Sequence, residues 1–354
     1  MNALRHLGLI AAIAITSCGS MAAVYKQILS LDDMRSTEGS GNVYTVIIED
    51  DDAYCILSNS SGGQSGRITK ISGVSTSKTY SQILSTAEWN EANGGVTSSL
   101  ATIYDGRIVG DYIQFSDSST DAIWRVNRNT GEVTCYASQA DILAATGQTA
   151  VSLASPFVVY GGEHYVYEGT SDSIIRTNGA NNVDIFLTSA QLTAISGNST
   201  VSGGIDFDSS GNLYWGSNDS DSLYSWDGAN GSTVLDVADI TAVTGGSSAG
   251  FGDIYYGQDG NVYFYETTTK SILCFDVNAT SAADSLTMLF SAAELIAGDA
   301  ASNSVGTFAW YDGHIAWSTI STLANIGFYV AVPEPATIVL LTIGTFGAMF
   351  RRRR

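Results

Sequence analysis

The sequence predicts an all-β fold, a six-bladed β-propeller of four-stranded blades with a short helix after each outer strand. Three observations support this prediction. A capped helical segment recurs six times, at intervals of 48 to 55 residues. Runs that alternate between apolar and polar residues, as strands do, separate these segments. The run from Val24 to Ser30 supplies the one strand that the last unit lacks. Four antiparallel strands in about 50 residues match the period of a propeller blade.

Each helical segment opens on an N-cap residue: Ser30, Ser85, Ser138, Thr188, Asp236 and Ser291. Three residues later a second side chain completes a capping box, at Asp33, Glu88, Asp141, Gln191, Asp239 and Glu294. Apolar residues flank the caps as staple pairs, for example Leu84 with Trp89 and Leu187 with Leu192. A glycine, expected in the left-handed conformation, ends each segment at Gly39, Gly94, Gly147, Gly197, Gly245 and Gly298.

The strands are clearest in the fourth unit. There "GGIDF", "GNLYWGS", "SLYSWDG" and "STVLD" run from the inner strand to the outer one, and the third and fifth units repeat the pattern. After Gly298 only "VGTFAWY", "HIAWST" and "ANIGFYV" remain. The segment "VYKQILS" at Val24 precedes the first helix as "TYSQILS" precedes the second. We therefore expect the N-terminal strand to close the last blade, which would protect the sheet edges at both ends.

The chain ends in an uncharged run of 15 residues from Ala336 to Phe350, followed by four arginines. As a helix this run would be about 22 Å long, and snorkelling arginines with local thinning of the bilayer would let it span. Four adjacent charges argue against a buried helix, since each would need a partner. The sequence predicts a C-terminal transmembrane helix with a cytoplasmic stop at Arg351, Arg352, Arg353 and Arg354.

Two prolines bracket the acidic residue just before this run, at Pro333, Glu334 and Pro335. Proline removes a backbone donor and favours extended geometry in the residue before it, so this segment is stiff and accessible to a protease. "VPEPAT", the apolar run and the arginines together resemble the PEP-CTERM sorting signal of Gram-negative bacteria, over residues 332–354 only. The resemblance implies an exosortase-type membrane protease as partner, processing near these prolines, and transfer to the cell surface or an exopolysaccharide matrix.

Residues 1–23 read as a secretory signal peptide, with Arg5 before an apolar core and small residues at Ala22 and Ala23. Alternatively, "ITSC" resembles a lipoprotein cleavage box in which Cys18 would be acylated. Both interpretations export the protein. The expected organisation is therefore signal peptide 1–23, propeller 24–331 and sorting signal 332–354.

The chain carries a formal net charge of −20, and removal of Arg5 and the four terminal arginines leaves a charge near −25. Such a surface repels nucleic acid, which excludes nucleic-acid partners, although it can attract calcium diffusely. Asp219 and Asp221 in "SNDSDS" are weak calcium candidates, because the segment lacks the glycine and terminal glutamate of an EF-hand loop. No other metal site, cofactor or catalytic residue is predicted.

Other acidic and histidine residues are assigned structural roles. Asp206, Asp208, Asp253 and Asp259 are expected near turns, and Asp50 to Asp52 in a solvated turn. His164 and His314 are expected at equivalent positions of two blades. Aromatic residues on the strands are expected to pack between blades, with an exposed carbohydrate-stacking rim as the alternative; they are Tyr214, Trp215, Tyr224, Trp226, Tyr263, Phe264 and Tyr265.

The segment "IDFDSSGNLYWGS" resembles six-bladed calcium-dependent lactonases, which hold their metal with glutamate, asparagine and aspartate near the channel entrance. The small residues that begin the inner strands here, as in "VSGG" and "SAGFG", offer no such set. We therefore expect an exported propeller that binds or scaffolds a saccharide or a surface protein without catalysis. The alternative is a secreted carbohydrate-active lactonase, lyase or hydrolase with its site in the axial channel.

Overall fold

The computed structural model describes residues 24–30, 32–33, 42–58, 67–95, 106–153, 157–179, 182–297, 304–319 and 327–332. Its contacts divide the chain into two units, Tyr25–Ala331 and the two ends together, Met1–Val24 with Val332–Arg354. The predicted signal peptide, the Pro333–Pro335 segment, the transmembrane helix and the four terminal arginines lie outside the described residues. None of the helices in the described part is long and apolar enough to cross a membrane.

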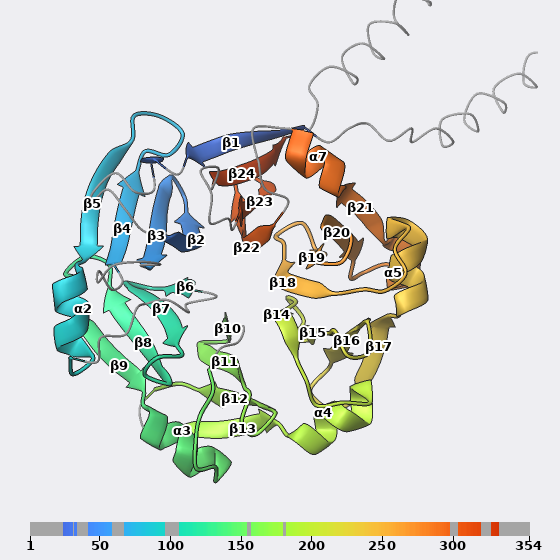
Figure 1. The fold of residues 1–354 in the computed structure, drawn as a ribbon, viewed down its shortest axis with the longest axis horizontal. Coiled ribbons are helices and arrows are strands. Elements are labelled where there is room, and N and C mark those ends of the chain that lie inside the picture. The colour runs from blue at the N-terminus through green and yellow to red at the C-terminus, as the bar shows by residue number, and fades with distance from the viewer. Residues whose placement is uncertain are drawn as a thin grey trace, which may run out of the picture. The chain divides into compact units, whose positions relative to one another are not determined.

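The first of the two units is a ring of six four-stranded antiparallel sheets (Figure 1). The first three blades, from inner to outer strand, are β2 (Asn42–Glu49), β3 (Asp52–Ser58), β4 (Arg67–Ser72) and β5 (Thr79–Leu84); β6 (Gly106–Val109), β7 (Tyr112–Asp117), β8 (Ala122–Asn127) and β9 (Val133–Ala137); and β10 (Phe157–Tyr160), β11 (Glu163–Glu168), β12 (Ser173–Thr177) and β13 (Val183–Leu187).

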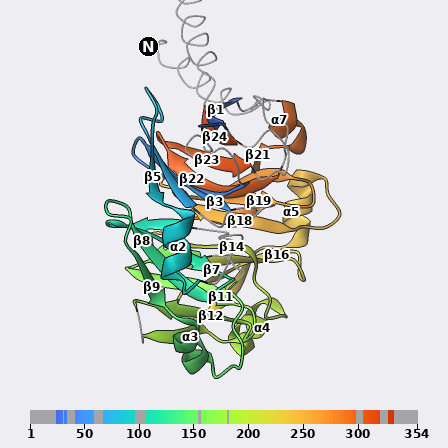
Figure 2. The same cartoon turned by 60° about the vertical axis from the view of Figure 1, so that its left-hand side comes forward.

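The other three blades follow the same order, and Figure 2 shows the ring turned by 60°. They are β14 (Ser202–Phe207), β15 (Leu213–Ser217), β16 (Ser222–Trp226) and β17 (Gly231–Leu235); β18 (Phe251–Tyr256), β19 (Asn261–Glu266), β20 (Ser271–Asp276) and β21 (Thr287–Phe290); and β22 (Val305–Tyr311), β23 (His314–Thr319), β24 (Gly327–Val332) and β1 (Val24–Ser30). The predicted six-bladed propeller is confirmed, including its closure by the N-terminal strand.

A helix follows the outer strand of each blade where the chain is described in full. These helices are α2 (Thr86–Ala92), α3 (Gln139–Thr146), α4 (Ser189–Ser196), α5 (Val237–Thr244) and α7 (Ala292–Ala297). The predicted capping boxes form on α2 to α5, and the hydrogen bonds of a capping box also join Ser291 to Glu294 and Ser30 to Asp33. A further helix, α6 (Ala282–Ser285), was not predicted, because its N-cap Ser281 makes no side-chain cap.

The ends of these helices also follow the sequence. Gly147, Gly197 and Gly245 are left-handed C-caps with φ between 69° and 80°, and Gly94 has φ 79° directly after the C-cap Asn93. Gly39 and Gly298 lie outside the described residues. In the described part of the chain the predicted staple residues are buried, with both Leu187 and Leu192 fully inaccessible to solvent. Each helix therefore fastens its outer strand to the connection that leads into the next blade.

The cap of α4 offers a direct test of this local design. Thr188 accepts a hydrogen bond from the backbone N–H of Gln191, whose side chain in turn accepts from the backbone N–H of Thr188. We expect Thr188→Ala to lower the free energy of unfolding by about 1 kcal/mol, because it removes the cap acceptor. Thr188→Ser keeps the hydroxyl and should cost only a few tenths. Urea unfolding of both variants measures the difference, and equal losses would contradict the capping role.

The hydrophobic core is divided among the interfaces between neighbouring blades. One cluster joins the first two blades around Trp89 and Phe115, and others join later blades around Trp215 and Phe264. Six of the seven strand aromatics singled out above are buried, and Trp226 is half-buried. Packing between blades is therefore their role, and they form no exposed rim.

Tyr25 anchors the closing strand β1 in the last interface. Its ring makes T-shaped contacts with Phe290, Trp317 and Tyr329, at centroid distances of 5.7, 5.5 and 5.4 Å. Its hydroxyl donates to the carbonyl of Leu295 in α7 over 2.9 Å. The closing strand thus contacts both the last blade and the helix that leads into it.

The inner strands of the fourth and fifth blades approach each other backbone to backbone. A Cβ on Gly203 would lie 2.0 Å from the carbonyl oxygen of Gly252, and one on Gly204 would lie 2.1 Å from the amide of Ile254. The small residues that begin these inner strands therefore serve close packing around the axis.

Candidate functional site

A pocket of about 230 Å³ lies among the inner strands around the axis of the ring. Its walls come from β2, β6, β18 and β22, and from the turn between β18 and β19 that contains Gln258. It extends as far as Glu49, the last residue of β2, and Trp310, near the end of β22. The resemblance to lactonases indicates a site at the opposite end, where the inner strands begin.

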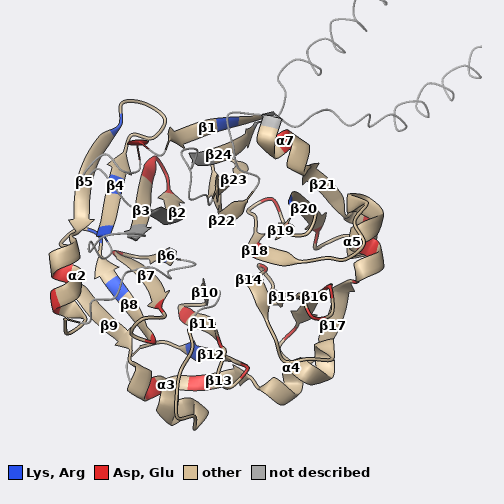
Figure 3. Cartoon of the chain, in the orientation of Figure 1, with Lys and Arg blue, Asp and Glu red and all other residues tan. Residues whose placement is uncertain are grey.

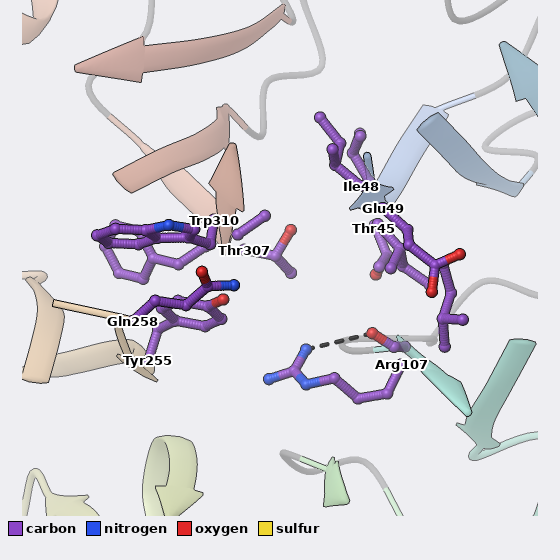
Figure 4. Close-up of a pocket in the computed structure, with 14 residues that line it drawn as sticks. Thr45, Ile48, Glu49, Arg107, Tyr255, Gln258, Thr307 and Trp310 are labelled. Carbon is purple, nitrogen blue, oxygen red and sulfur yellow. Dashed lines mark hydrogen bonds between the residues drawn. The ribbon is translucent and has the colours of Figure 1, made fainter. Parts of the chain in front are cut away.

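Polar side chains reach the central space of this pocket from several blades (Figure 4). The amide of Gln258, the hydroxyl of Thr307 and the guanidinium of Arg107 approach it from different sides, while Thr45 and Glu49 lie across from Gln258. One guanidinium nitrogen of Arg107 donates to the carbonyl of Gly106 over 3.2 Å. The lining thus offers hydrogen-bond donors and acceptors that can fix the orientation of a small polar ligand.

One wall of the pocket is aromatic. Trp310 and Tyr255 are both half-buried and lie on either side of Gln258 (Figure 4). Trp310 also packs against Tyr263, with ring centroids 6.4 Å apart. Gly257 makes room for it, since a Cβ there would lie 2.8 Å from the Trp310 ring. The orientation of Trp310 is therefore fixed by its neighbours.

Asp206 of β14 and Asp253 of β18 bridge the inner strands beside this pocket. Asp206 accepts hydrogen bonds from the backbone N–H groups of Phe207 and, in the next blade, Tyr256, both at 2.8 Å. Asp253 accepts from the N–H of Ile254 at 3.0 Å and, in the last blade, from that of Phe308 at 2.7 Å. Each carboxylate thus links its own blade to the next one.

These two carboxylates form an electrostatic group with Arg107. Burial raises the pKa of Asp206, and Arg107 opposes that rise. Burial also raises the pKa of Asp253 to about 6, with Arg107 again opposing and Asp206 adding to the rise. The expectation that Asp206 and Asp253 serve turns is wrong. The same expectation is correct for Asp208 and Asp259, whose carboxylates accept the N–H groups of Asn212 and Asn261 within the hairpins.

The calcium candidates lie in the hairpin between β15 and β16. Asp219 is exposed, and Asp221 has φ 50° directly before the third strand of its blade. Lys270 occupies the corresponding position of the fifth blade with φ 58°, so this place in the turn does not require an acid. Within the described ranges no three His, Cys, Asp or Glu side chains gather as a metal cluster. Calcium binding at Asp219 and Asp221 stays a prediction.

In the acidic run at Asp50 to Asp52, the first two residues form the turn between β2 and β3, as expected, and Asp52 begins β3. Asp50 has φ 53°, and the carboxylate of Asp51 accepts the N–H of Ser75 over 2.7 Å. Asp52 forms an ion pair with Lys70 at 2.6 Å. Asp50 and Asp51 therefore serve the local structure of the turn, and Asp52 joins β3 to β4.

The two histidines are not equivalent, because their strand registers differ by one residue. His164 pairs with Val159, whereas His314 pairs with Tyr311 and so corresponds to Glu163. His164 is buried against Tyr136, 4.4 Å between ring centroids, and burial lowers its pKa to about 4. His314 is half-buried beside the carbonyl of Asp312. A one-residue shift places the two side chains on opposite faces of their sheets.

A second set of carboxylates has a structural role that was not predicted from the sequence. Asp117, Glu168 and Glu266 end the second strands of three blades and are fully buried. Glu168 accepts the N–H groups of Thr170 and Ser171 in the next hairpin and that of Ser152 before the inner strand. Glu266 repeats this arrangement with Thr268, Thr269 and Gly250. The recurring strings "YEGTSDS" and "YETTTKS" were the available signal.

The charged side chains of the propeller are few and mostly acidic (Figure 3). Helices α2, α3, α5 and α7 each carry an acid in the first turn, and none carries a basic residue in the last. This arrangement matches the helix dipole at the N-terminal end. The surface is consistent with the negative net charge of the chain.

Comparison with known proteins identifies a sorting motif at the C-terminal end and finds solved structures with a similar fold. The model of the PEP-CTERM protein-sorting motif matches residues 331–354. No curated protein matches the sequence. Similar solved structures include a catalytically inactive virginiamycin B lyase from Staphylococcus aureus with quinupristin, at TM-score 0.52, 12% identity and 89% coverage of both chains.

Two other similar structures have the same TM-score of 0.52. One is a luciferin-regenerating enzyme, at 8% identity and with 88% of this chain and 96% of that chain covered. The other is a protein of unknown function from Bacteroides thetaiotaomicron, at 9% identity and with 83% and 70% covered. At these identities the likeness concerns the fold alone. The chain is thus a six-bladed β-propeller that carries a PEP-CTERM sorting motif, which marks it for export and for processing by an exosortase-type membrane protein.

Proposed function

We propose that this protein is a non-catalytic saccharide-binding propeller, displayed at the cell surface or in an exopolysaccharide matrix of a Gram-negative bacterium. The observation that carries the proposal is the axial pocket, in which the rings of Trp310 and Tyr255 flank the amide of Gln258. Aromatic rings beside hydrogen-bonding groups suit a sugar, which presents both C–H faces and hydroxyl groups. The sorting motif would deliver this pocket to the place where such polymers accumulate.

The hydrogen bonds around the pocket favour binding over catalysis. Both oxygens of Asp206 and both oxygens of Asp253 already accept backbone N–H groups. A general acid or base must instead lie within hydrogen-bond reach of the proton that it transfers. Glu49, the carboxylate that lines the pocket, is paired with Arg128.

A carbohydrate-active enzyme remains the second candidate. The raised pKa of Asp253, about 6, is the observation that favours it, because perturbed carboxyl groups concentrate at catalytic sites. In such an enzyme Asp253 would release its backbone partners when substrate binds. Incubation with exopolysaccharide, followed by mass spectrometry of the soluble sugars, separates the two candidates, since only the enzyme generates new chain ends.

The binding proposal is tested with the exported, processed protein on a glycan array and in a pulldown from exopolysaccharide. We expect saccharide capture without turnover. We further expect Trp310→Ala to reduce capture by about tenfold or more, because the variant loses the large apolar ring surface on which a sugar can stack. Circular dichroism checks that the Trp310→Ala variant is folded. If the pulldown captured surface proteins and no saccharide, the saccharide-binding proposal would be wrong and the ligand would be a protein.

Location is tested separately by deleting the tail. We expect loss of residues 336–354 to abolish surface display, because the chain then lacks both the apolar run and the arginines that would hold it at the membrane. Protease shaving of intact cells measures display. Substitution of Glu334 by Gln tests the motif itself and keeps the apolar run. Unchanged display in the deletion would contradict the sorting role.

A further inference from the structure

The size and position of the axial pocket limit what can enter it. Its volume of about 230 Å³ is below the 300–1,000 Å³ of pockets that hold drug-sized ligands. Inner strands of four consecutive blades line it, and β18, β22, β2 and β6 follow one another around the axis in Figure 1. A pocket of this volume beside the axis has room for one sugar unit, and the end of a polymer is the part that can place a single unit there.

The lining can also recognise a single sugar ring. Gln258 is exposed at the pocket and offers both an amide donor and an acceptor, and Thr307 and Arg107 approach the same space. Trp310 provides a half-buried aromatic surface whose position is fixed by Tyr263 and Gly257. One aromatic surface with polar groups around it suits a single pyranose unit.

The charges near the pocket disfavour an anion. Arg107 and Glu49 are the charged residues of its lining. Asp206 and Asp253 both interact electrostatically with Arg107, and Glu49 is paired with Arg128. Three carboxylates thus stand against two guanidinium groups. The surrounding chain adds to this negative balance, with 35 acidic and 15 basic residues.

We propose that the pocket binds the terminal sugar unit of a polysaccharide, either neutral or carrying an ammonium group, and rejects terminal uronates. This inference rests on the proposed saccharide binding and adds the part of the polymer and its charge class. Arg107 would donate to ring or hydroxyl oxygens while its charge is balanced by Asp206 and Asp253. A uronate would bring an uncompensated carboxylate into a site of net negative charge.

The test is titration of the full-length protein, in a detergent without sugar groups, with three probes at pH 7. The probes are methyl glucoside, glucosamine and glucuronate, followed by saturation-transfer NMR and calorimetry. We expect the first two to bind in the millimolar range and glucuronate at least tenfold more weakly. Gln258→Ala should weaken methyl glucoside about fivefold or more. Gln139→Ala, which alters an exposed glutamine on α3 outside the pocket lining, should change nothing.

A charge variant tests the electrostatic part by itself. Glu49→Gln removes one negative charge from the pocket lining and should shift the glucosamine-to-glucuronate affinity ratio about fivefold toward glucuronate, which is roughly the 1 kcal/mol that one nearby charge contributes in a hydrated site. An unchanged ratio, or tightest binding of glucuronate by the unaltered protein, would overturn the charge class and leave saccharide binding standing. Capture of polymer with no binding of any single sugar would overturn the end-binding site. Failure of both polymer and sugars to bind would overturn the proposed function as well.

Discussion

Removal of the closing strand is expected to lower the melting temperature by about 10 °C or more. Deletion of residues 24–29 takes away the outer strand β1 of the last blade and the fully buried side chain of Leu29. It also removes Tyr25 from a cluster of three aromatic rings. A loss of several kcal/mol corresponds to a shift of this size in a domain of about 300 residues. Thermal unfolding followed by circular dichroism measures it, and an unchanged melt would contradict closure by β1.

The chain supplies its own control for this prediction. "VYKQILS" and "TYSQILS" place a tyrosine at the same position of two outer strands, Tyr25 in β1 and Tyr80 in β5. Tyr25 is half-buried among aromatic rings, whereas Tyr80 is 39% exposed and donates to Asp33. We expect Tyr25→Ala to cost about 3 kcal/mol and Tyr80→Ala less than about 1 kcal/mol. Equal costs would mean that the closing strand contributes no more than an ordinary outer strand.

Much of the fold was predictable because its information is local and repeated. A capping box depends on two residues three apart, so each helix could be located from its own sequence, and six copies fixed the blade period. The closing strand was predictable because three strands remained after the last helix. Helix α6 escaped prediction because Ser281 does not cap it and no staple pair marks it.

The site was harder to predict because its residues come from different blades. Arg107 and Asp206 lie about 100 residues apart in the chain, and their electrostatic interaction depends on how the ring arranges β6 and β14 around one axis. Asp208 and Asp259 bind within their own hairpins and were assigned correctly from turn composition. The error over His164 and His314 came from a register shift of one residue, which composition alone does not reveal.

The second large effect concerns how stability depends on pH through Asp253. Burial, with Asp206 as a further cause, raises the pKa of Asp253 from 3.8 to about 6, although Arg107 and the N–H of Phe308 oppose the rise. The folded protein therefore holds this proton at pH values where the unfolded chain has released it. Its contribution to stability is fully present below about pH 4 and is lost as the pH rises through about 6. A shift of about 2 units corresponds to about 3 kcal/mol.

Asp253→Asn removes this titration while keeping the shape of the side chain. Relative to the variant, the unaltered protein should lose most of this contribution, about 2 kcal/mol of unfolding free energy, between pH 4 and pH 7, as measured by urea denaturation at each pH. The comparison cancels the carboxylates whose pKa lies below its usual value, such as Glu168, because both proteins share them and their stability is lost only at lower pH. Asp227→Asn is the matched control, since Asp227 is exposed in the hairpin between β16 and β17 and its pKa is lowered by backbone hydrogen bonds. Parallel pH profiles for the protein and Asp253→Asn would mean that the carboxylate stays ionised throughout and that its two backbone N–H partners and Arg107 outweigh the cost of burial.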